Sequence, residues 1–238
     1  MHTFYVPKSQ INDQVSISGS EHHHLRNGLR LRPNEKVRII DGEGSVCIAK
    51  VIRIGSESSH ARVLSHKFHE RKTPLITLFQ GVPKNDKMTQ ILQKTTELGV
   101  TEIVPISTER SLQEPSKNRI ERWERIVISA TKQCKRVWLP RLCDIKPLGE
   151  CLNNFQTYNL SLLLWENETE QHIKSVLQRA TNLESIAILV GPEGGLTDKE
   201  ANDVIKCGCV PVSLGTNILR TETAAIASIV IVAYECQI

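Results

Sequence analysis

The sequence predicts an α/β protein in which a small β-barrel precedes a larger domain built on a mostly parallel sheet. Short apolar runs separated by tight turns fill the first third of the 238 residues, which is typical of a small barrel. From residue 73 onward, apolar runs alternate with amphipathic segments, as strands alternate with crossover helices. We therefore expect two domains, residues 1–72 and 73–238.

The first domain is expected to contain strands at 37–40, 46–54 and 61–64. Asp41 and Gly42 separate the first two runs, and an Asp-Gly pair between alternating apolar residues favours a β-hairpin. The polar segment from 66 to 73 precedes a proline and is the expected linker.

The second domain is expected to alternate strands with helices. Apolar residues at spacings of three and four between Met88 and Leu98 favour a helix, with Gly99 as its C-cap. The run Ile186–Val190 is apolar throughout, as expected when both faces of a strand are covered. The expected strands are 75–79, 101–106, 160–165, 185–190 and 210–214, and the expected helices are 88–98, 120–134, 168–180, 198–207 and 222–235.

The composition excludes several classes of protein. With 39% hydrophobic and 24% charged residues, the chain is neither disordered nor collagen-like. Its longest apolar stretch, Ala224–Tyr234, is too short to span a bilayer, and the N-terminus lacks the apolar core of a signal peptide. Seven cysteines without regular spacing are expected to be reduced thiols. We expect a soluble cytoplasmic protein that holds no metal and binds no membrane.

Positive charge is concentrated at the N-terminus. Residues 1–72 carry 12 Lys and Arg against 7 Asp and Glu, whereas residues 73–238 carry 18 against 19. A basic piece joined to a near-neutral one suggests a module that binds anions such as nucleic acid. The alternative is a small basic domain that binds nothing.

Two loops of the second domain follow expected strands, and ligands of α/β proteins collect at the carboxyl ends of strands. The loop Gly191–Leu196 is rich in glycine, which lets a ligand approach the backbone. Thr197 and Glu200 form a capping box that opens the next helix. The loop 214–223 places Glu222 at a helix N-terminus, where the helix dipole favours it. The alternatives are a tight turn and simple capping. Neither loop is a P-loop or a GxGxxG dinucleotide fingerprint.

The last expected helix is apolar nearly all round between Ala224 and Tyr234. Such a helix is buried on all sides, either as a central core helix or in a homodimer interface. We expect both together, because an outer face would otherwise leave a large exposed apolar patch.

Several motifs occur in the order in which one known family carries them. They are Lys87-Met88, Gln93–Val100, Thr108–Ser111, Ala130–Arg136, Gly191–Gly195, Leu214-Gly215 and Ile218–Ala224. Together they resemble the ribosomal RNA small subunit methyltransferase E (RsmE) family of SPOUT-class enzymes. The resemblance covers essentially the whole chain, and the two C-terminal loops in tandem are its most specific part.

The resemblance implies methylation of uridine N3 in the decoding region of 16S rRNA, on an assembled small subunit, with S-adenosylmethionine as donor. It also implies a PUA-like N-terminal barrel, a SPOUT domain with a C-terminal trefoil knot, and a homodimer through that domain. Both loops would belong to the knot and hold the donor mainly through backbone groups. The implied donor residues are Leu189, Gly191, Gly194, Gly195, Leu214, Gly215, Asn217, Ile218 and Leu219.

The implied reaction needs a base and groups that stabilise negative charge, because uridine N3 carries an imide proton. Glu193 and Glu222 are the candidate bases, and Arg220 is the candidate for stabilising the uracil oxygens. For Glu222, a structural pairing with an arginine across the subunits is the alternative. RNA phosphates are expected at Arg26, Arg30, Arg32, Arg38 and Arg136.

Two positions depart from the family pattern. Lys132 stands where relatives usually carry a glutamate, and Asn217 stands where they often carry a basic residue. Two other functions therefore stay open: a non-catalytic rRNA-binding assembly factor, and a SPOUT RNA methyltransferase with another target nucleoside.

Overall fold

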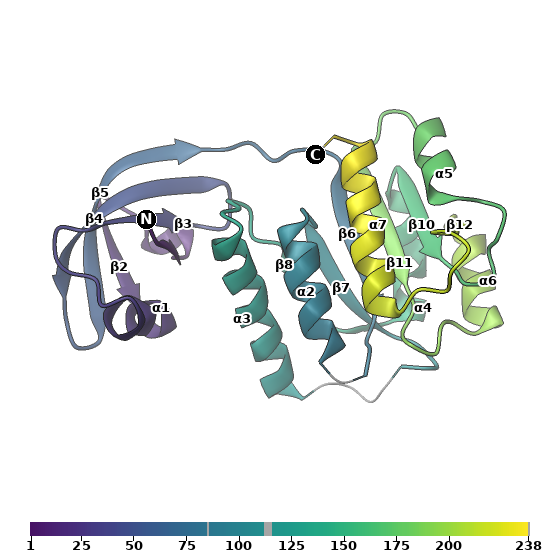
Figure 1. Ribbon diagram of the computed structural model, residues 1–238, viewed down its shortest axis with the longest axis horizontal. Coiled ribbons are helices and arrows are strands. Elements are labelled where there is room, and N and C mark those ends of the chain that lie inside the picture. Colours follow the sequence, from purple (N-terminus) through teal and green to yellow (C-terminus); the bar gives the residue numbers. More distant parts are fainter. Residues whose placement is uncertain (85, 112–115, 238) are drawn as a thin grey trace. The chain divides into compact units, whose positions relative to one another are not determined.

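The computed structural model describes residues 1–84, 86–111 and 116–237, and the chain forms two compact units (Figure 1). One unit comprises Met1–Arg71 together with Thr131–Leu139. The other comprises Lys72–Ala130 together with Pro140–Ile238.

The N-terminal unit is a curled sheet with the strand order β1-β3-β4-β5-β2. Its strands pair antiparallel except for β1 with β3, and fully buried side chains such as Phe4, Ile17 and Ile39 form its core. Its elements are β1 (Thr3–Tyr5), a 3-10 helix (Lys8–Gln10), β2 (Gln14–Ser18), α1 (Gly19–His23), a π-helix (His24–Gly28), β3 (Lys36–Ile40), β4 (Ser45–Ile54) and β5 (Ser58–Phe68).

The expected hairpin between β3 and β4 is present. The Asp41 carboxylate accepts the backbone N–H groups of Glu43 and Ser45 at 2.8 and 2.9 Å, which fixes the turn. The expected linker begins too early, because β5 continues to Phe68 along the first residues of β4. The sequence also missed β1, which has only three residues, and β2, although Val15 and Ile17 alternate with more exposed neighbours as in a strand.

The segment 131–139 packs with the N-terminal unit, although the sequence places it within the second domain. The Leu139 N–H donates to the Gly42 carbonyl at 2.9 Å, and the Trp138 indole N–H donates to the His69 carbonyl at 3.1 Å. Two sequence-distant pieces therefore build one unit, which a pattern read along the chain does not reveal.

The second unit contains a parallel sheet in the order β12-β10-β11-β6-β7-β8, with β9 beside β7. Its strands are β6 (Leu75–Gly81), β7 (Glu102–Ser107), β8 (Arg141–Leu142), β9 (Lys146–Pro147), β10 (Leu160–Leu164), β11 (Ser185–Val190) and β12 (Val210–Val212). The helices are α2 (Lys87–Glu97), α3 (Lys117–Gln133), α4 (Leu148–Cys151), a 3-10 helix (Leu152–Thr157), α5 (Ile173–Arg179), α6 (Asp198–Lys206) and α7 (Thr221–Glu235).

Helices cover both faces of this sheet, which explains its continuously apolar strands. In Figure 1, α2 and α7 lie side by side across one face. On the other face, α4 and α6 enclose a core that includes Phe79, Leu163 and Leu189. The predicted alternation of strands and helices is thus confirmed, as is the capping box of Thr197 and Glu200.

Helix α5 begins at Ile173 rather than at 168. The Glu168 carboxylate accepts the backbone N–H groups of Glu170 and Gln171, at 2.8 and 2.9 Å, and so holds a turn. His172 then forms a β-bridge with Ser213, which keeps the chain extended until the helix starts.

Helix α7 buries one face and exposes the other. Ala225, Ile229 and Val232 are fully buried, whereas Val230 is 44% exposed and Tyr234 is 80% exposed. Part of the predicted all-round burial is therefore absent from the single chain. Within the described residues, no helix is long and apolar enough to cross a membrane. All seven cysteines are free thiols.

Candidate functional site

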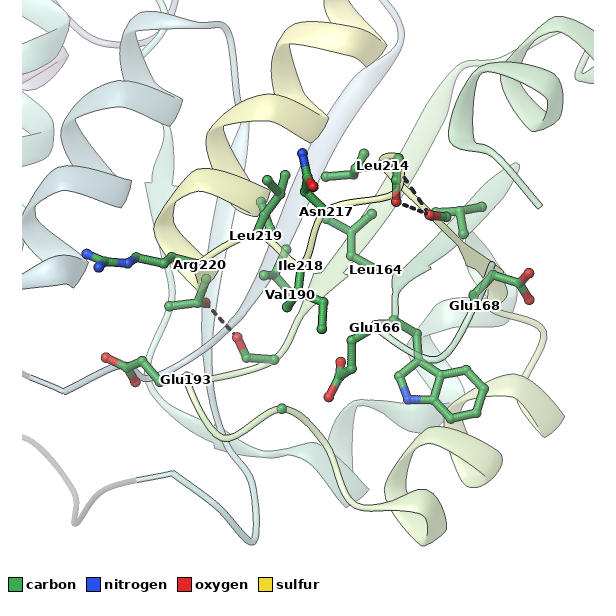
Figure 2. A pocket seen from close by; sticks show the side chains of 18 of the residues that line it. Leu164, Glu166, Glu168, Val190, Glu193, Leu214, Asn217, Ile218, Leu219 and Arg220 are labelled. Carbon is green, nitrogen blue, oxygen red and sulfur yellow. Dashed lines mark hydrogen bonds between the residues drawn. The ribbon is translucent and has the colours of Figure 1, made fainter. Parts of the chain in front are cut away.

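A cavity of about 770 Å³ opens where the carboxyl ends of β10, β11 and β12 meet (Figure 2). Three loops line it: the β10 loop (Trp165–His172), the glycine loop (Gly191–Leu196) and the α7 loop (Leu214–Arg220). These strands are neighbours in a parallel sheet, so their following loops converge at one edge. The fold therefore builds one concave site from segments distant in sequence.

A close backbone contact explains one glycine at this site, and a positive φ explains another. A Cβ on Gly81, the last residue of β6, would lie 2.5 Å from the Pro192 nitrogen. Gly195 has φ of +68°, and a Cβ there would lie 2.2 Å from Oε1 of Glu166. Arg110 holds the glycine loop from outside, since its guanidinium donates to the Gly194 carbonyl at 2.7 Å.

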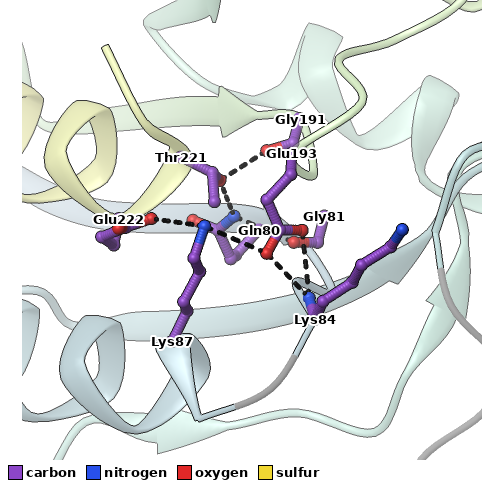
Figure 3. A network of polar contacts seen from close by, with 8 residues as sticks. All are labelled: Gln80, Gly81, Lys84, Lys87, Gly191, Glu193, Thr221 and Glu222. Carbon is purple, nitrogen blue, oxygen red and sulfur yellow. Dashed lines mark hydrogen bonds and ion pairs between the residues drawn. The ribbon is translucent and has the colours of Figure 1, made fainter.

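A buried relay of hydrogen bonds ties the start of α7 to the glycine loop (Figure 3). The side-chain amide of Gln80 donates to Oγ1 of Thr221 at 2.9 Å, and that hydroxyl donates to the Gly191 carbonyl at 2.6 Å. Gln80 is fully buried and Thr221 is 6% exposed, so water does not compete for these contacts.

A charged contact joins the same two segments (Figure 3). The Lys87 ammonium lies 3.2 Å from Oε1 of Glu193 and 3.4 Å from Oε2 of Glu222. Both oxygens of Glu193 also accept the backbone N–H of Lys84 at 3.0 Å. Burial raises the pKa of Glu193, but these hydrogen bonds and the ammonium outweigh it, so the pKa lies below its ordinary value.

The structure brings together the donor residues expected from the resemblance, with one difference. Leu189 does not line the cavity: its side chain is fully buried in the core beside Phe79 and Leu163. Side chains alternate along a strand, so the next residue, Val190, faces the cavity instead. The expected residues that do line it are Gly191, Gly194, Gly195, Leu214, Gly215, Asn217, Ile218 and Leu219.

The three candidate catalytic residues lie near one another. Arg220 and Glu193 line the cavity, and the Arg220 side chain is exposed just before α7. Glu222 lies in the first turn of that helix and is outside the cavity lining, yet it shares the Lys87 ammonium with Glu193. No arginine pairs with Glu222 among the described residues.

Sequence reasoning missed three contributors to the site. The β10 loop brings Glu166 and Glu168 to the cavity, whereas the sequence predicts helix from 168 onward and no role for Glu166. Gln80 is the one strongly polar side chain within the otherwise apolar end of β6, and that contrast was a usable signal. Lys87 belongs to one of the motifs that carry the resemblance, but its place between two carboxylates depends on the fold.

Carboxylates outnumber cations around the cavity. Glu166, Glu168 and Glu193 line it together with Lys87 and Arg220. Backbone N–H groups, first that of Gln171, lower the pKa of Glu168. Such a surface favours a ligand with positive charge over a polyphosphate. No group of metal ligands was found among the described residues.

The expected RNA-binding arginines belong to the N-terminal unit. Arg26, Arg30 and Arg32 are exposed, and Arg26 donates to the Ser56 carbonyl at 3.1 Å. Arg38 is half-buried and donates to the Lys135 carbonyl at 3.2 Å. Burial lowers the pKa of Arg136 to about 10. The exposed three are thus the better placed for phosphate contacts.

The departure at Lys132 has a structural explanation. Its ammonium forms an ion pair with Oε1 of Glu21, and both side chains are mostly buried. Glu21 also accepts the backbone N–H of Tyr5 at 3.2 Å. Lys132 is therefore engaged within the N-terminal unit. Nothing in the structure explains Asn217.

Comparisons with known proteins agree with this architecture. Residues 70–233 match the RNA methyltransferase domain family, and residues 17–64 match the RNA methyltransferase PUA domain family. Ribosomal RNA small subunit methyltransferase E of Synechocystis sp. is 33% identical over 221 residues, covering 92% of this chain and 72% of that protein. The protein of the same name from Aquifex aeolicus is 32% identical over 237 residues, covering 95% of this chain and 96% of that protein.

A solved structure extends the similarity to the whole fold. It is the crystal structure of ribosomal RNA small subunit methyltransferase E from Neisseria gonorrhoeae bound to S-adenosyl methionine. Its TM-score is 0.88 at 33% sequence identity, and the match covers 98% of this chain and 97% of that chain. The predicted fold class, a PUA-like unit followed by an α/β SPOUT methyltransferase domain, is confirmed. The chain belongs to the ribosomal RNA small subunit methyltransferase E family.

Proposed function

We propose that this chain transfers a methyl group from S-adenosylmethionine to N3 of a uridine in the decoding region of 16S rRNA. The observation that carries the proposal is the cavity at the ends of β10, β11 and β12. The relative from Neisseria gonorrhoeae, of the same family and fold, was crystallised with S-adenosyl methionine. The family supplies the class of RNA, and the cavity supports the donor.

The cavity residues fit this donor in shape and in charge. Its volume of about 770 Å³ is within the usual range for small-molecule sites. Gly191, Gly195 and Gly215 have no side chains that would keep a ligand away from the backbone. The carboxylates of Glu166 and Glu168 suit a ligand that carries a sulfonium and an ammonium. When bound, S-adenosylmethionine supplies an electrophilic methyl group.

The contacts support Glu222, rather than Glu193, as the group that takes the N3 proton. Both oxygens of Glu193 are occupied by the Lys84 N–H, and its lowered pKa makes it a weak base. Glu222 accepts no hydrogen bond from the described residues, and Lys87 pairs with its Oε2. Its other oxygen, Oε1, receives the proton. Glu193 anchors the glycine loop.

Arg220 stabilises the negative charge that develops on the uracil ring. Its exposed guanidinium precedes α7 at the rim of the cavity and is therefore accessible to a base brought there. A cation aimed at the uracil oxygens lowers the barrier most when it is already in position before the reaction.

The N-terminal unit holds the RNA around the target base. Its exposed Arg26, Arg30 and Arg32 contact phosphates, which position an RNA without reading its sequence. Arg38 and Arg136 contribute less, because both are partly buried. The target uridine leaves its stack to reach the cavity, as bases do in enzymes that modify them. The substrate is the assembled small ribosomal subunit in the cytoplasm.

A second copy of this chain covers the exposed side of α7. Val230 and Tyr234 are exposed there, and Ile218 of the neighbouring loop is 84% exposed. Isolated exposed apolar residues are ordinary, but here they follow one helix and its loop, as in an interface. The two loops form the trefoil knot implied by the resemblance, and the dimer encloses the site.

The test is transfer of labelled methyl from S-adenosylmethionine to small ribosomal subunits that lack the modification. We expect label in 16S rRNA that depends on this protein and on its cavity. Tight binding to the subunits without transfer of label would instead identify a non-catalytic assembly factor.

A further inference from the structure

One ammonium joins the two loops that form the donor cavity. Lys87 begins α2, and its Nζ lies within 3.4 Å of a carboxylate oxygen on each of Glu193 and Glu222 (Figure 3). Glu193 belongs to the glycine loop, and Glu222 follows the α7 loop. Lys87 itself comes from a third segment and also lines the cavity.

A single ammonium lies within ion-pair distance of both carboxylates. Two oxygens within 3.4 Å of one nitrogen are at most about 7 Å apart, where like charges repel appreciably in a poorly hydrated site. The side chains of Glu193 and Glu222 are 23% and 13% exposed, so solvent screens them only in part.

Glu222 depends on this contact more than Glu193 does. Glu193 keeps the Lys84 N–H when the ammonium is removed, whereas Oε2 of Glu222 is buried and has no hydrogen-bond partner. A buried carboxylate without a partner is unfavourable. Without the ammonium, the Glu222 side chain or the start of α7 is therefore expected to shift away from Glu193.

We propose that Lys87 is a positioning residue that sets the spacing of the glycine loop and the start of α7, and so shapes the donor cavity and aims Glu222. The proposal rests on the proposed function, because it assigns Lys87 a role in that same site. Lys87 acts through the two glutamates.

The test compares Lys87→Met with Lys94→Met in the full-length protein. Lys94 lies on the same helix and pairs with Glu97 at 3.0 Å on the surface, outside the cavity. The substitution Lys94→Met is therefore a matched control, because it also removes a lysine that forms an ion pair. Binding of S-adenosylhomocysteine is measured by calorimetry. We expect Lys87→Met to weaken binding about tenfold or more and Lys94→Met to change it less than twofold.

A second variant separates positioning from a general loss of packing. The double variant Lys87→Met/Glu222→Gln lacks one of the two carboxylates that repel each other. Binding of S-adenosylhomocysteine should therefore return to within about threefold of the wild type. Methyl transfer should stay low, because Glu222 is absent. If the double variant binds no better than Lys87→Met, charge neutralisation is not the role of Lys87.

Hydrogen exchange of the ligand-free protein provides a readout that does not depend on any donor. We expect faster exchange of amides in residues 191–196 of Lys87→Met than of the wild type, with slow exchange recovered in the double variant. Unchanged exchange and unchanged binding in Lys87→Met would overturn the proposal, although wild-type methyl transfer would still support the proposed function. Absence of transfer by the wild type overturns that function instead, while the exchange data still decide whether Lys87 holds the loops.

Discussion

Gly81 offers a sharp test of how the glycine loop is placed. This residue ends β6, directly beneath the glycine loop, and a Cβ there would lie 2.5 Å from the Pro192 nitrogen and 2.9 Å from the Gly191 carbonyl carbon. These are backbone atoms, so no side chain can rotate away. In Gly81→Ala, the glycine loop must retreat by about 1 Å to restore an ordinary contact.

The expected magnitude follows from the cost of overpacking a well-packed site, which is about 1–3 kcal/mol. We expect the free energy of unfolding of Gly81→Ala to fall by that amount, because Gly81 does not have positive φ and adds no backbone strain of its own. The displaced loop also forms the wall of the donor cavity. Since about 1.4 kcal/mol corresponds to tenfold in affinity, we expect S-adenosylhomocysteine to bind roughly tenfold more weakly.

The assay combines urea unfolding with calorimetric titration of S-adenosylhomocysteine. Gly149→Ala is the control, since that glycine lies in α4 and its added Cβ would meet no atom within 4 Å. Alanine there should leave binding unchanged and leave stability equal or slightly higher. Wild-type affinity in Gly81→Ala would refute the idea that the position of the glycine loop determines donor binding.

Three further predictions follow from the contacts. Thr221→Val removes the buried hydroxyl of the relay and should lower the free energy of unfolding by about 1–3 kcal/mol. Thr221→Ser keeps a hydroxyl and should retain most of the wild-type stability. Urea unfolding of both variants measures the difference. The folded pKa of Glu193 lies below its ordinary value of 4.5, so ionised Glu193 stabilises the fold above pH 4.5. This stabilisation is lost as the pH falls through the folded pKa. The free energies of unfolding of the wild type and Glu193→Gln should therefore differ at neutral pH and become equal in acid. Replacing Arg26, Arg30 and Arg32 by alanine should weaken binding to rRNA and flatten its dependence on salt by about 0.7–0.9 per lost phosphate contact, measured by salt titration; an unchanged slope would contradict their role.

The sequence predicted the parallel sheet well because its strands and helices have distinct periods. The apolar run 186–190, the helix ended by Gly99 and the capping box at Thr197 all correspond to features of the structure. Local pattern also located the glycine loop and the α7 loop, since both follow buried strands. The first turn of the expected helix from 168 was misread because the Glu168 carboxylate caps a turn of non-helical backbone.

Features that depend on which elements meet in space could not be predicted from the sequence pattern. The strand order that brings the β10 loop beside the other two loops cannot be read from periodicity. In a strand that is apolar on both faces, alternation does not tell whether Leu189 or Val190 faces the cavity. The same holds for Lys87, whose role depends on two glutamates from other segments.

The central claim is that the cavity directs a methyl group to N3 of uridine. The most direct measurement digests 16S rRNA from small subunits methylated by this protein to nucleosides and identifies the labelled one by mass and retention time. We expect 3-methyluridine, formed by the wild type and lost in Glu222→Gln. Label in a ribose 2′-O-methyl nucleoside, or in a base other than uracil, would contradict it.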